Sequence, residues 1–104
     1  MKVCIVGLGL IGGSYAKGLT KKGYEVYGVD KNLKTIEYAK ENGMIVDGYL
    51  DASCCLNFVD LVVICLYPND VIPFIKENLK HFKDGQVITD VCGVKASICY
   101  EATS

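Results

Sequence analysis

Three glycines near the N-terminus, Gly7, Gly9 and Gly12, constrain the fold of this chain more than any other feature. They form a G-x-G-x-x-G pattern that directly follows the apolar run Val3–Val6 and opens a segment whose apolar residues have helical spacing. Asp30 lies eighteen residues after Gly12, at the end of a second predicted strand. A glycine turn between a strand and a helix, followed by an acidic residue at this distance, predicts a βαβ unit that binds a dinucleotide.

Each glycine has a physical reason to be there. Gly7 permits a tight turn out of the strand, Gly9 lets a pyrophosphate approach the backbone, and Gly12 lets the helix pack close to the strand. The helix N-terminus then offers N–H donors and partial positive charge to the phosphates. The alternative is that the glycines serve only as turn residues, which the strand–turn–helix context disfavours.

Asp30 also indicates which dinucleotide is bound. Its carboxylate is expected to accept hydrogen bonds from the adenine ribose hydroxyls and to repel a 2′-phosphate. All eleven basic residues are lysines, so no arginine is available to neutralise that phosphate. Lys31 and Lys34 lie nearby and leave NADP open, although they are more simply interpreted as solvated surface residues. The sequence therefore favours NAD over NADP.

The other apolar segments predict a Rossmann-like, doubly wound α/β fold. The run 61–66 is continuously apolar, which is typical of a central parallel strand covered on both faces. Alternating strands and helices imply right-handed crossovers and five strands in the order 3-2-1-4-5, without a sixth strand. The further strands are predicted over 25–29, 45–46 and 87–89. Helices are predicted over 12–22, from Asn32 to Gly43, from Asn69 or Asp70 with Pro73 in the first turn, and from Val94 to Tyr100. The segment 51–57 is ambiguous, with one helical turn as the interpretation that its sequence allows.

Helical spacing also predicts which side chains face the sheet. The expected inward residues are Ile11, Tyr15, Ala16 and Leu19 in the first helix, Leu33, Ile36 and Ala39 in the second, and Val71, Ile72, Ile75 and Leu79 in the third.

Two loops are expected at the same sheet edge as the glycine turn. The segment 66–68 leaves the fourth strand at the topological switch point, and the segment 90–93 leaves the fifth strand. The first should flank the ribose and the second the nicotinamide, where Cys92 is most simply an ordinary loop cysteine. The predicted cofactor-binding residues are Gly7, Leu8, Gly9, Leu10, Ile11, Gly12, Asp30, Lys31, Leu66, Tyr67 and Pro68.

Composition narrows the class of protein. The chain has 104 residues, enough for one domain; 51% are hydrophobic, 22% are charged, and the net charge is −1. This excludes intrinsic disorder and disfavours nucleic-acid or membrane partners. Six cysteines occur without a C-x-x-C pair and with a single histidine, His81, so reduced thiols in the cytoplasm are expected rather than a disulfide scaffold or a metal site.

Three segments carry a resemblance to a known family. Gly7-Leu8-Gly9-Leu10-Ile11-Gly12-Gly13-Ser14 resembles the N-terminal motif of prephenate dehydrogenases, and G-L-G-L-I-G-G-S is far more specific than the general glycine pattern. Val26–Asp30 resembles the family's second strand. Thr89–Lys95 resembles its T-D-x-x-x-V-K segment, with Gly93 where some members have a serine near the substrate hydroxyl, which puts a serine contribution in doubt.

The resemblance implies an activity for the whole enzyme and a limited role for this chain. The family oxidises prephenate, passes hydride to NAD and releases CO2, giving 4-hydroxyphenylpyruvate in tyrosine biosynthesis. Its catalytic histidine and substrate arginines lie beyond the part that this chain resembles. We therefore expect residues 1–104 to be a truncated dinucleotide-binding domain that binds NAD, has no catalytic residue of its own and lacks the substrate and dimerisation domain.

Alternatives from other classes remain open. One alternative is a non-catalytic NAD-sensing or interaction module. Another is the cofactor domain of a related β-hydroxyacid or arogenate dehydrogenase. An unpaired edge on the fifth strand is expected to cause self-association, for example as a homodimer.

Overall fold

A six-stranded sheet forms the centre of the computed structural model, which describes residues 1–90 and 98–101. Its order is 3-2-1-4-5-6; the first five strands are parallel and the sixth is antiparallel to the fifth. The predicted order of the five parallel strands is confirmed. The strands are β1 (Lys2–Val6), β2 (Glu25–Val29), β3 (Asp47–Tyr49), β4 (Leu61–Ile64), β5 (Val87–Asp90) and β6 (Ile98–Glu101).

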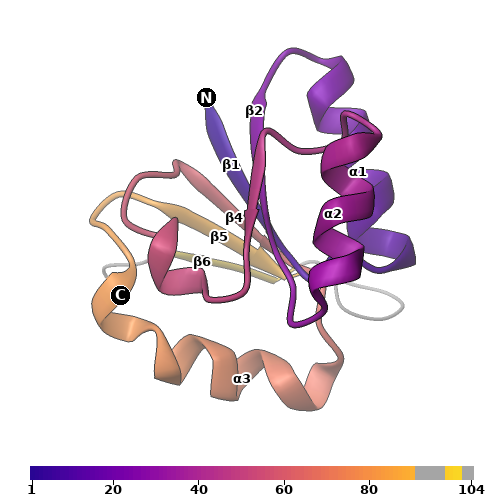
Figure 1. Ribbon diagram of the computed structural model, residues 1–104. Coiled ribbons are helices and arrows are strands. Elements are labelled where there is room, and N and C mark those ends of the chain that lie inside the picture. Colours follow the sequence, from indigo (N-terminus) through magenta and orange to yellow (C-terminus); the bar gives the residue numbers. More distant parts are fainter. Residues whose placement is uncertain (91–97, 102–104) are drawn as a thin grey trace.

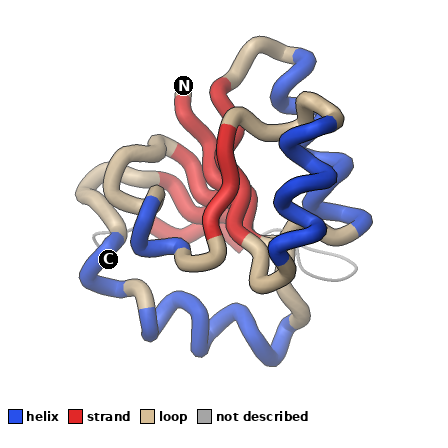
Figure 2. Tube along the Cα trace, in the orientation of Figure 1, coloured by secondary structure: helices blue, strands red, loops and turns tan. Residues whose placement is uncertain are grey.

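Helices cover both faces of the sheet, as Figures 1 and 2 show. The helices α1 (Leu10–Lys21) and α2 (Leu33–Glu41) lie side by side on one face. The helix α3 (Pro68–Glu77) and the short 3-10 helix Ala52–Cys54 lie on the other. A further 3-10 turn, Leu79–His81, follows α3. This is the predicted doubly wound arrangement, in which right-handed crossovers carry the helices to opposite faces on either side of β1.

The last strand corrects three expectations, the first being that the sheet has no sixth strand. The predicted helix from Val94 to Tyr100 is wrong over residues 98–100, which belong to β6, while residues 94–97 lie outside the described part of the chain. The edge of β5 is not open, because β5 pairs with β6 from Val87 opposite Glu101 to Asp90 opposite Ile98. The run I-C-Y has high strand propensity, and pairing satisfies the backbone groups that an edge would leave exposed.

Strand β3 begins two residues later than predicted. The sequence favours the β-branched pair 45–46, but the strand is Asp47–Tyr49, with Gly48 opposite Gly28 in β2. A Cβ added to Gly48 would overlap Cγ2 of Ile36, so α2 packs too closely on this strand for a side chain. A glycine that looks like a strand breaker is here a requirement of helix packing.

Two apolar clusters lie on opposite faces of the sheet. One, under α1 and α2, contains Val3, Ile5, Leu8, Ala16, Val26, Ile36, Ala39, Ile45 and Val63. The other, facing α3 and the 3-10 helix, contains Cys4, Val6, Val29, Ala52, Cys55, Leu56, Val59, Val62, Ile64, Val71 and Ile88.

Several predicted inward residues face outward instead. The helices touch the sheet through narrow stripes of small or β-branched residues, so the larger neighbouring side chains lie beyond the contact. The predicted inward residues that are exposed are Ile11, Tyr15, Leu33, Ile72 and Leu79.

The helix α3 begins earlier than predicted. Its first residue is Pro68, a position that suits proline, so Pro73 lies in the second turn and not in the first.

Two polar contacts tie the chain together away from the glycine turn. The buried side chain of Gln86 donates from Nε2 to the carbonyl oxygens of Leu56 and Val59, both at 2.7 Å. This holds the segment after the 3-10 helix against the start of β5. The amide of Gln86 therefore gives each of these buried carbonyl oxygens a hydrogen-bond donor.

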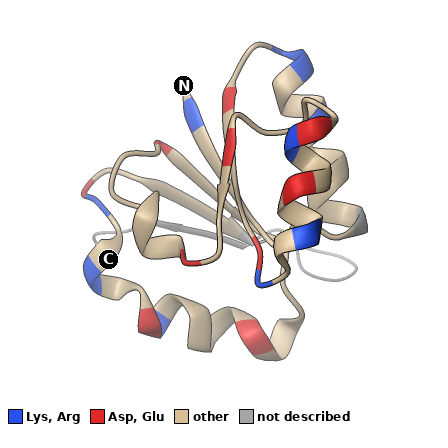
Figure 3. Cartoon of the chain, in the orientation of Figure 1, with Lys and Arg blue, Asp and Glu red and all other residues tan. Residues whose placement is uncertain are grey.

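Asp60 joins the start of β1 to the turn before β5. Its Oδ2 accepts a hydrogen bond from the backbone N–H of Lys2 at 2.9 Å, and its Oδ1 lies 3.3 Å from Nζ of Lys83. The Lys2 N–H and then the Lys83 ammonium lower the pKa of this carboxyl below its ordinary value. Figure 3 shows that acidic and basic residues are interspersed over the helices and strand ends.

Candidate dinucleotide-binding site

The turn between β1 and α1 can be made only with glycine at its first position. Gly7 has a φ of 92°, a region that side chains disfavour, and its N–H donates to the carbonyl of Val29 at 2.7 Å. A Cβ added to Gly7 would lie 2.7 Å from the carbonyl oxygen of Cys65. The turn is therefore enclosed by the ends of β2 and β4, with no room for a side chain.

Gly12 brings α1 close to this turn. A Cβ added to Gly12 would overlap the carbonyl oxygen of Gly7 and lie 2.8 Å from its carbonyl carbon. Gly12 itself is buried. The structure thus shows the close approach of helix and turn that the spacing predicts for the third glycine of the motif.

Gly9 lies on the solvent-exposed side of the turn. It is exposed, and a Cβ added to it would meet no atom within 4 Å. It is the N-cap residue of α1, and no side chain caps the helix. The N-terminus of α1 therefore has no side-chain cap and begins beside open space at a residue without a side chain, which fits an anionic group such as a pyrophosphate.

Asp30 has a structural role that the sequence did not reveal. Its Oδ2 accepts a hydrogen bond from the N–H of Leu8, at 2.8 Å, and its Oδ1 accepts one from the N–H of Asn32, at 2.9 Å. Asn32 in turn caps α2 by accepting from the N–H of Lys34 at 2.9 Å. The D-x-N spacing is a signal for the local turn and cap, but the contact with Leu8 spans 22 residues.

The connection from β4 to α3 lies beside the glycine turn, at the edge where the parallel strands end (Figure 1). Leu66 is half-buried, and its Cδ2 lies 3.3 Å from where a Cβ of Gly7 would be. Tyr67 is 81% exposed at the N-cap of α3, and Pro68 is the first residue of that helix. The segment 66–68 therefore lies beside the glycine turn, as the sequence predicts, whereas residues 91–93 of the other predicted loop lie outside the described residues.

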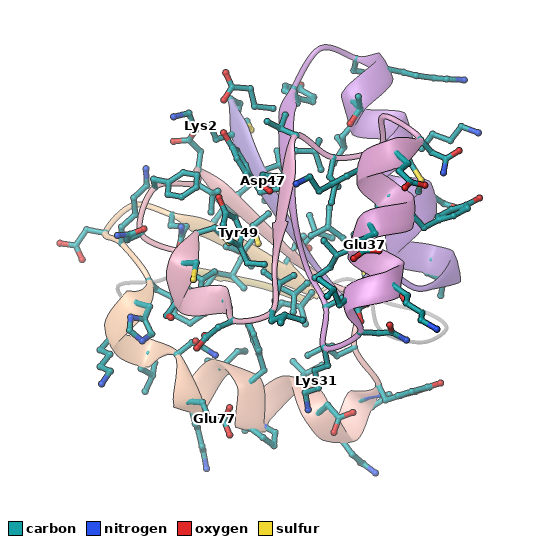
Figure 4. All side chains as sticks on the ribbon, viewed as in Figure 1. Lys2, Lys31, Glu37, Asp47, Tyr49 and Glu77 are labelled. Atoms are coloured by element: carbon teal, nitrogen blue, oxygen red, sulfur yellow. The ribbon has the colours of Figure 1, made fainter. Side chains whose placement is uncertain are left out.

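The remaining predicted binding residues differ in exposure. Leu8 is buried against Gly28, Ile11 is exposed on α1, and Leu10 is the first residue of α1. Lys31 is exposed in the loop between β2 and α2, where Figure 4 labels it. Its side chain makes no ion pair with Asp30 among the contacts of the described residues.

Other predicted features lie elsewhere. Asp90 is the last residue of β5, and Cys92 and Gly93 lie outside the described residues. His81 ends the 3-10 turn after α3. Within residues 1–90 and 98–101, no cluster of three histidine, cysteine or acidic residues could hold a metal ion. No helix in that part of the chain is both long and apolar enough to cross a membrane.

Together, the parallel sheet, the glycine turn and the uncapped helix define the nucleotide-binding domain of an α/β dehydrogenase. The family model described as "Prephenate dehydrogenase, nucleotide-binding domain" matches residues 15–104. The chain belongs to this family. Because that match begins after Gly12, the family assignment and the glycine motif are independent observations.

Solved structures and one curated protein are also similar. The Synechocystis arogenate dehydrogenase matches with a TM-score of 0.86 and 31% identity, over 92% of this chain and 34% of its own. Prephenate dehydrogenase from A. aeolicus, in complex with hydroxyphenyl propionate and NAD+, matches with a TM-score of 0.83 and 29% identity, over 92% and 35%. UDP-N-acetyl-D-mannosamine dehydrogenase of Methanococcus maripaludis is 41% identical over 46 residues, which are 44% of this chain and 11% of that protein. The chain thus spans 34–35% of the two matched enzymes.

Proposed function

We propose that this chain binds NAD across the glycine turn, as the cofactor-binding domain of a dehydrogenase acting on prephenate or arogenate. One observation carries the proposal: Gly12 is packed against Gly7 without room for a Cβ, while Gly9 faces open space at an uncapped helix N-terminus. Close packing on one side and free space on the other are what a backbone cradle for a pyrophosphate requires.

The chain's own residues divide the binding between them. The first N–H groups of α1 donate to the pyrophosphate, and Gly9 allows it to reach them. Asp30 keeps unused lone pairs on both oxygens, beyond the bonds from Leu8 and Asn32, and accepts from the ribose hydroxyls. Tyr67 and Pro68 flank the bound molecule. When bound, the nicotinamide supplies a hydride acceptor for the substrate.

The preference for NAD over NADP rests on the fixed position of the Asp30 carboxylate. Two backbone N–H groups hold it at the end of β2, so it cannot rotate away from a 2′-phosphate without losing hydrogen bonds. Lys31 is exposed and free to remain in solvent. Repulsion between the carboxylate and the phosphate therefore outweighs attraction to a mobile lysine.

The substrate assignment rests on the similar enzymes. An arogenate and a prephenate dehydrogenase both match over 92% of this chain, and the family model carries the prephenate name. Among the described residues, the ones to which we assign a binding role contact the dinucleotide, and we assign none of them to the binding of the substrate. Steady NADH formation from prephenate by residues 1–104 alone would contradict this division of roles.

The binding proposal is tested by calorimetric titration with NAD and NADP, using two matched alanine variants. Gly9→Ala and Gly18→Ala each add a methyl group where no atom lies within 4 Å, so neither creates a clash within the protein. Only the methyl of Gly9→Ala stands in the path of the pyrophosphate. We expect this variant to bind NAD at least about tenfold more weakly, whereas Gly18→Ala binds like the wild type.

The outcomes separate the two parts of the proposal. Equal NAD binding by wild type and Gly9→Ala would exclude the glycine turn as the site. Binding of NADP as tight as that of NAD would refute the role of Asp30 in discrimination. A non-catalytic NAD-binding module is distinguished by assaying a full-length protein of the family's length, in which prephenate or arogenate should drive reduction of NAD.

A further inference from the structure

Two cysteines that are far apart in the sequence touch in the core. Cys4 lies in β1, and Cys55 directly follows the 3-10 helix Ala52–Cys54. Their Sγ atoms are 3.3 Å apart across 51 residues of sequence, and both residues are 0% exposed. Cys54, next to Cys55, is exposed instead. The contact therefore depends on the fold rather than on neighbouring positions in the chain.

The surroundings of the pair are apolar. Both cysteines belong to the cluster between the sheet and α3, together with Val6, Leu56 and Val62. The hydrogen bond with Cys55 and then burial raise the pKa of the Cys4 thiol well above its ordinary value. Cys4 therefore stays protonated and protected from solutes while the core is closed.

We propose that Cys4 and Cys55 are a dithiol that small-molecule disulfides convert into an intramolecular disulfide. In the first step one thiol of the pair loses its proton, and its sulfur attacks the small disulfide to form a mixed disulfide and release one small thiolate. In the second step the other protein sulfur displaces the second small thiolate. The protein loses two electrons and two protons, and the small disulfide gains both and leaves as two thiols.

The geometry favours the second step over competing reactions. A disulfide has an S–S distance of about 2.05 Å, so the two sulfurs must approach by only about 1.2 Å from their 3.3 Å contact. Access requires opening of the segment that carries Cys55, which the side chain of Gln86 fastens at Leu56 and Val59. Reaction is therefore slow in the closed protein, and the product is an internal bond rather than a stable mixed disulfide.

The inference does not depend on dinucleotide binding. A Cys4–Cys55 bond would join the central strand β1 to the segment after the 3-10 helix and close a loop of about fifty residues. Such a cross-link restricts the unfolded chain, so the oxidised protein should melt at a higher temperature than the reduced protein.

The test uses the full chain with Cys92→Ser and Cys99→Ser, which leaves Cys4, Cys54, Cys55 and Cys65 as its cysteines. The protein is equilibrated in buffers of reduced and oxidised glutathione, quenched with acid, alkylated and digested with trypsin. A Cys4–Cys55 bond links the peptide 3–17, which contains only Cys4, to the peptide 41–76. Fragmentation of the linked peptides places the bond at a particular cysteine without any further variant.

Cys54→Ser and Cys55→Ser form the matched pair. We expect Cys54→Ser to keep the linked peptides and Cys55→Ser to lose them, although the substitutions are adjacent. The effective concentration of one thiol for the other should be at least about tenfold higher in the folded chain than in denaturant, because folding holds the sulfurs in contact.

Three results would overturn the proposal. The first is the absence of linked peptides in the most oxidising buffer, including the case where glutathione is found only on Cys54. The second is a bond that fragmentation places at Cys54 or Cys65. The third is an effective concentration of one thiol for the other that is no higher in the folded chain than in denaturant, which would mean that folding does not favour the disulfide.

Discussion

Gly12 and Gly18 lie in the same helix, and the structure predicts opposite effects for the same substitution. Replacing a helical glycine with alanine stabilises the helix by about 1 kcal/mol when nothing is in the way. A methyl group on Gly18 meets no atom within 4 Å. Gly18→Ala should therefore raise the free energy of unfolding by about 0.5–1 kcal/mol.

A methyl group on Gly12 meets backbone atoms. It would overlap the Gly7 carbonyl oxygen and lie 2.8 Å from the carbonyl carbon, and backbone atoms cannot avoid it by changing rotamer. Overpacking costs about 3 kcal/mol at the upper end of the usual range, and helix propensity returns about 1 kcal/mol. Gly12→Ala should therefore destabilise the protein by about 2 kcal/mol, which lowers Tm by about 10 °C for a chain of this size.

Urea and thermal unfolding followed by far-UV circular dichroism measure both variants against the wild type. The two substitutions should change the stability in opposite directions within one helix, so a general effect of alanine in α1 cannot produce the result. A Gly12→Ala protein within about 0.5 kcal/mol of the wild type, an ordinary surface effect, would refute the close packing of helix on turn. So would a Gly18→Ala protein that is the less stable of the two.

Three further predictions concern contacts away from the glycine motif. Asn32→Ala removes the cap of α2 and should cost about 1 kcal/mol in urea unfolding, whereas Asn32→Ser keeps a capping oxygen and most of the stability. Gln86→Met keeps the volume but removes the donor to two buried carbonyls; a loss of about 2 kcal/mol is expected, and a neutral result would show that water replaces the side chain. The folded state lowers the pKa of Asp60 through the N–H of Lys2 and then Lys83, so its carboxylate stabilises the fold at neutral pH and this contribution is lost as the pH falls through the lowered value. The difference in urea midpoint between wild type and Asp60→Asn should therefore be constant above about pH 5 and shrink as the pH falls through the lowered pKa of Asp60, whereas a difference that grows in acid would reverse the assigned sign.

Much of the fold could be predicted because its signals are local. The glycine turn, the run 61–66 and the Asn32 cap each act within a few residues, and together with the handedness of crossovers they determine the strand order. The position of β3 could not be found this way. It depends on how closely Ile36 approaches Gly48, which is a property of two elements packed together.

The candidate site likewise has some features that follow from local sequence and others that depend on contacts between distant residues. The roles of Gly7 and Gly12 follow from the motif, and the structure has the positive φ and the close approach that these roles require. The bond from Leu8 to Asp30 crosses 22 residues, and no periodicity or local motif signals it. The outward positions of Tyr15 and Ile72 were missed because apolar spacing does not show how narrow the contact between helix and sheet is.

The central position of β1 has a consequence for the synthesis of this protein. β1 is made before both of its neighbours in the sheet. β2 can pair with one of its edges soon afterwards, but β4, which pairs with the other edge, begins about 55 residues after β1 ends. At about 5–20 residues per second, the ribosome needs about 3–11 s to add those residues. During that interval the nascent chain carries an apolar strand with one unpaired edge, which is a binding site for chaperones or for another nascent chain. Proteolysis of ribosome-bound chains of increasing length should show protection of β1 appearing only after β4 is made, and protection once β2 is complete would contradict this order.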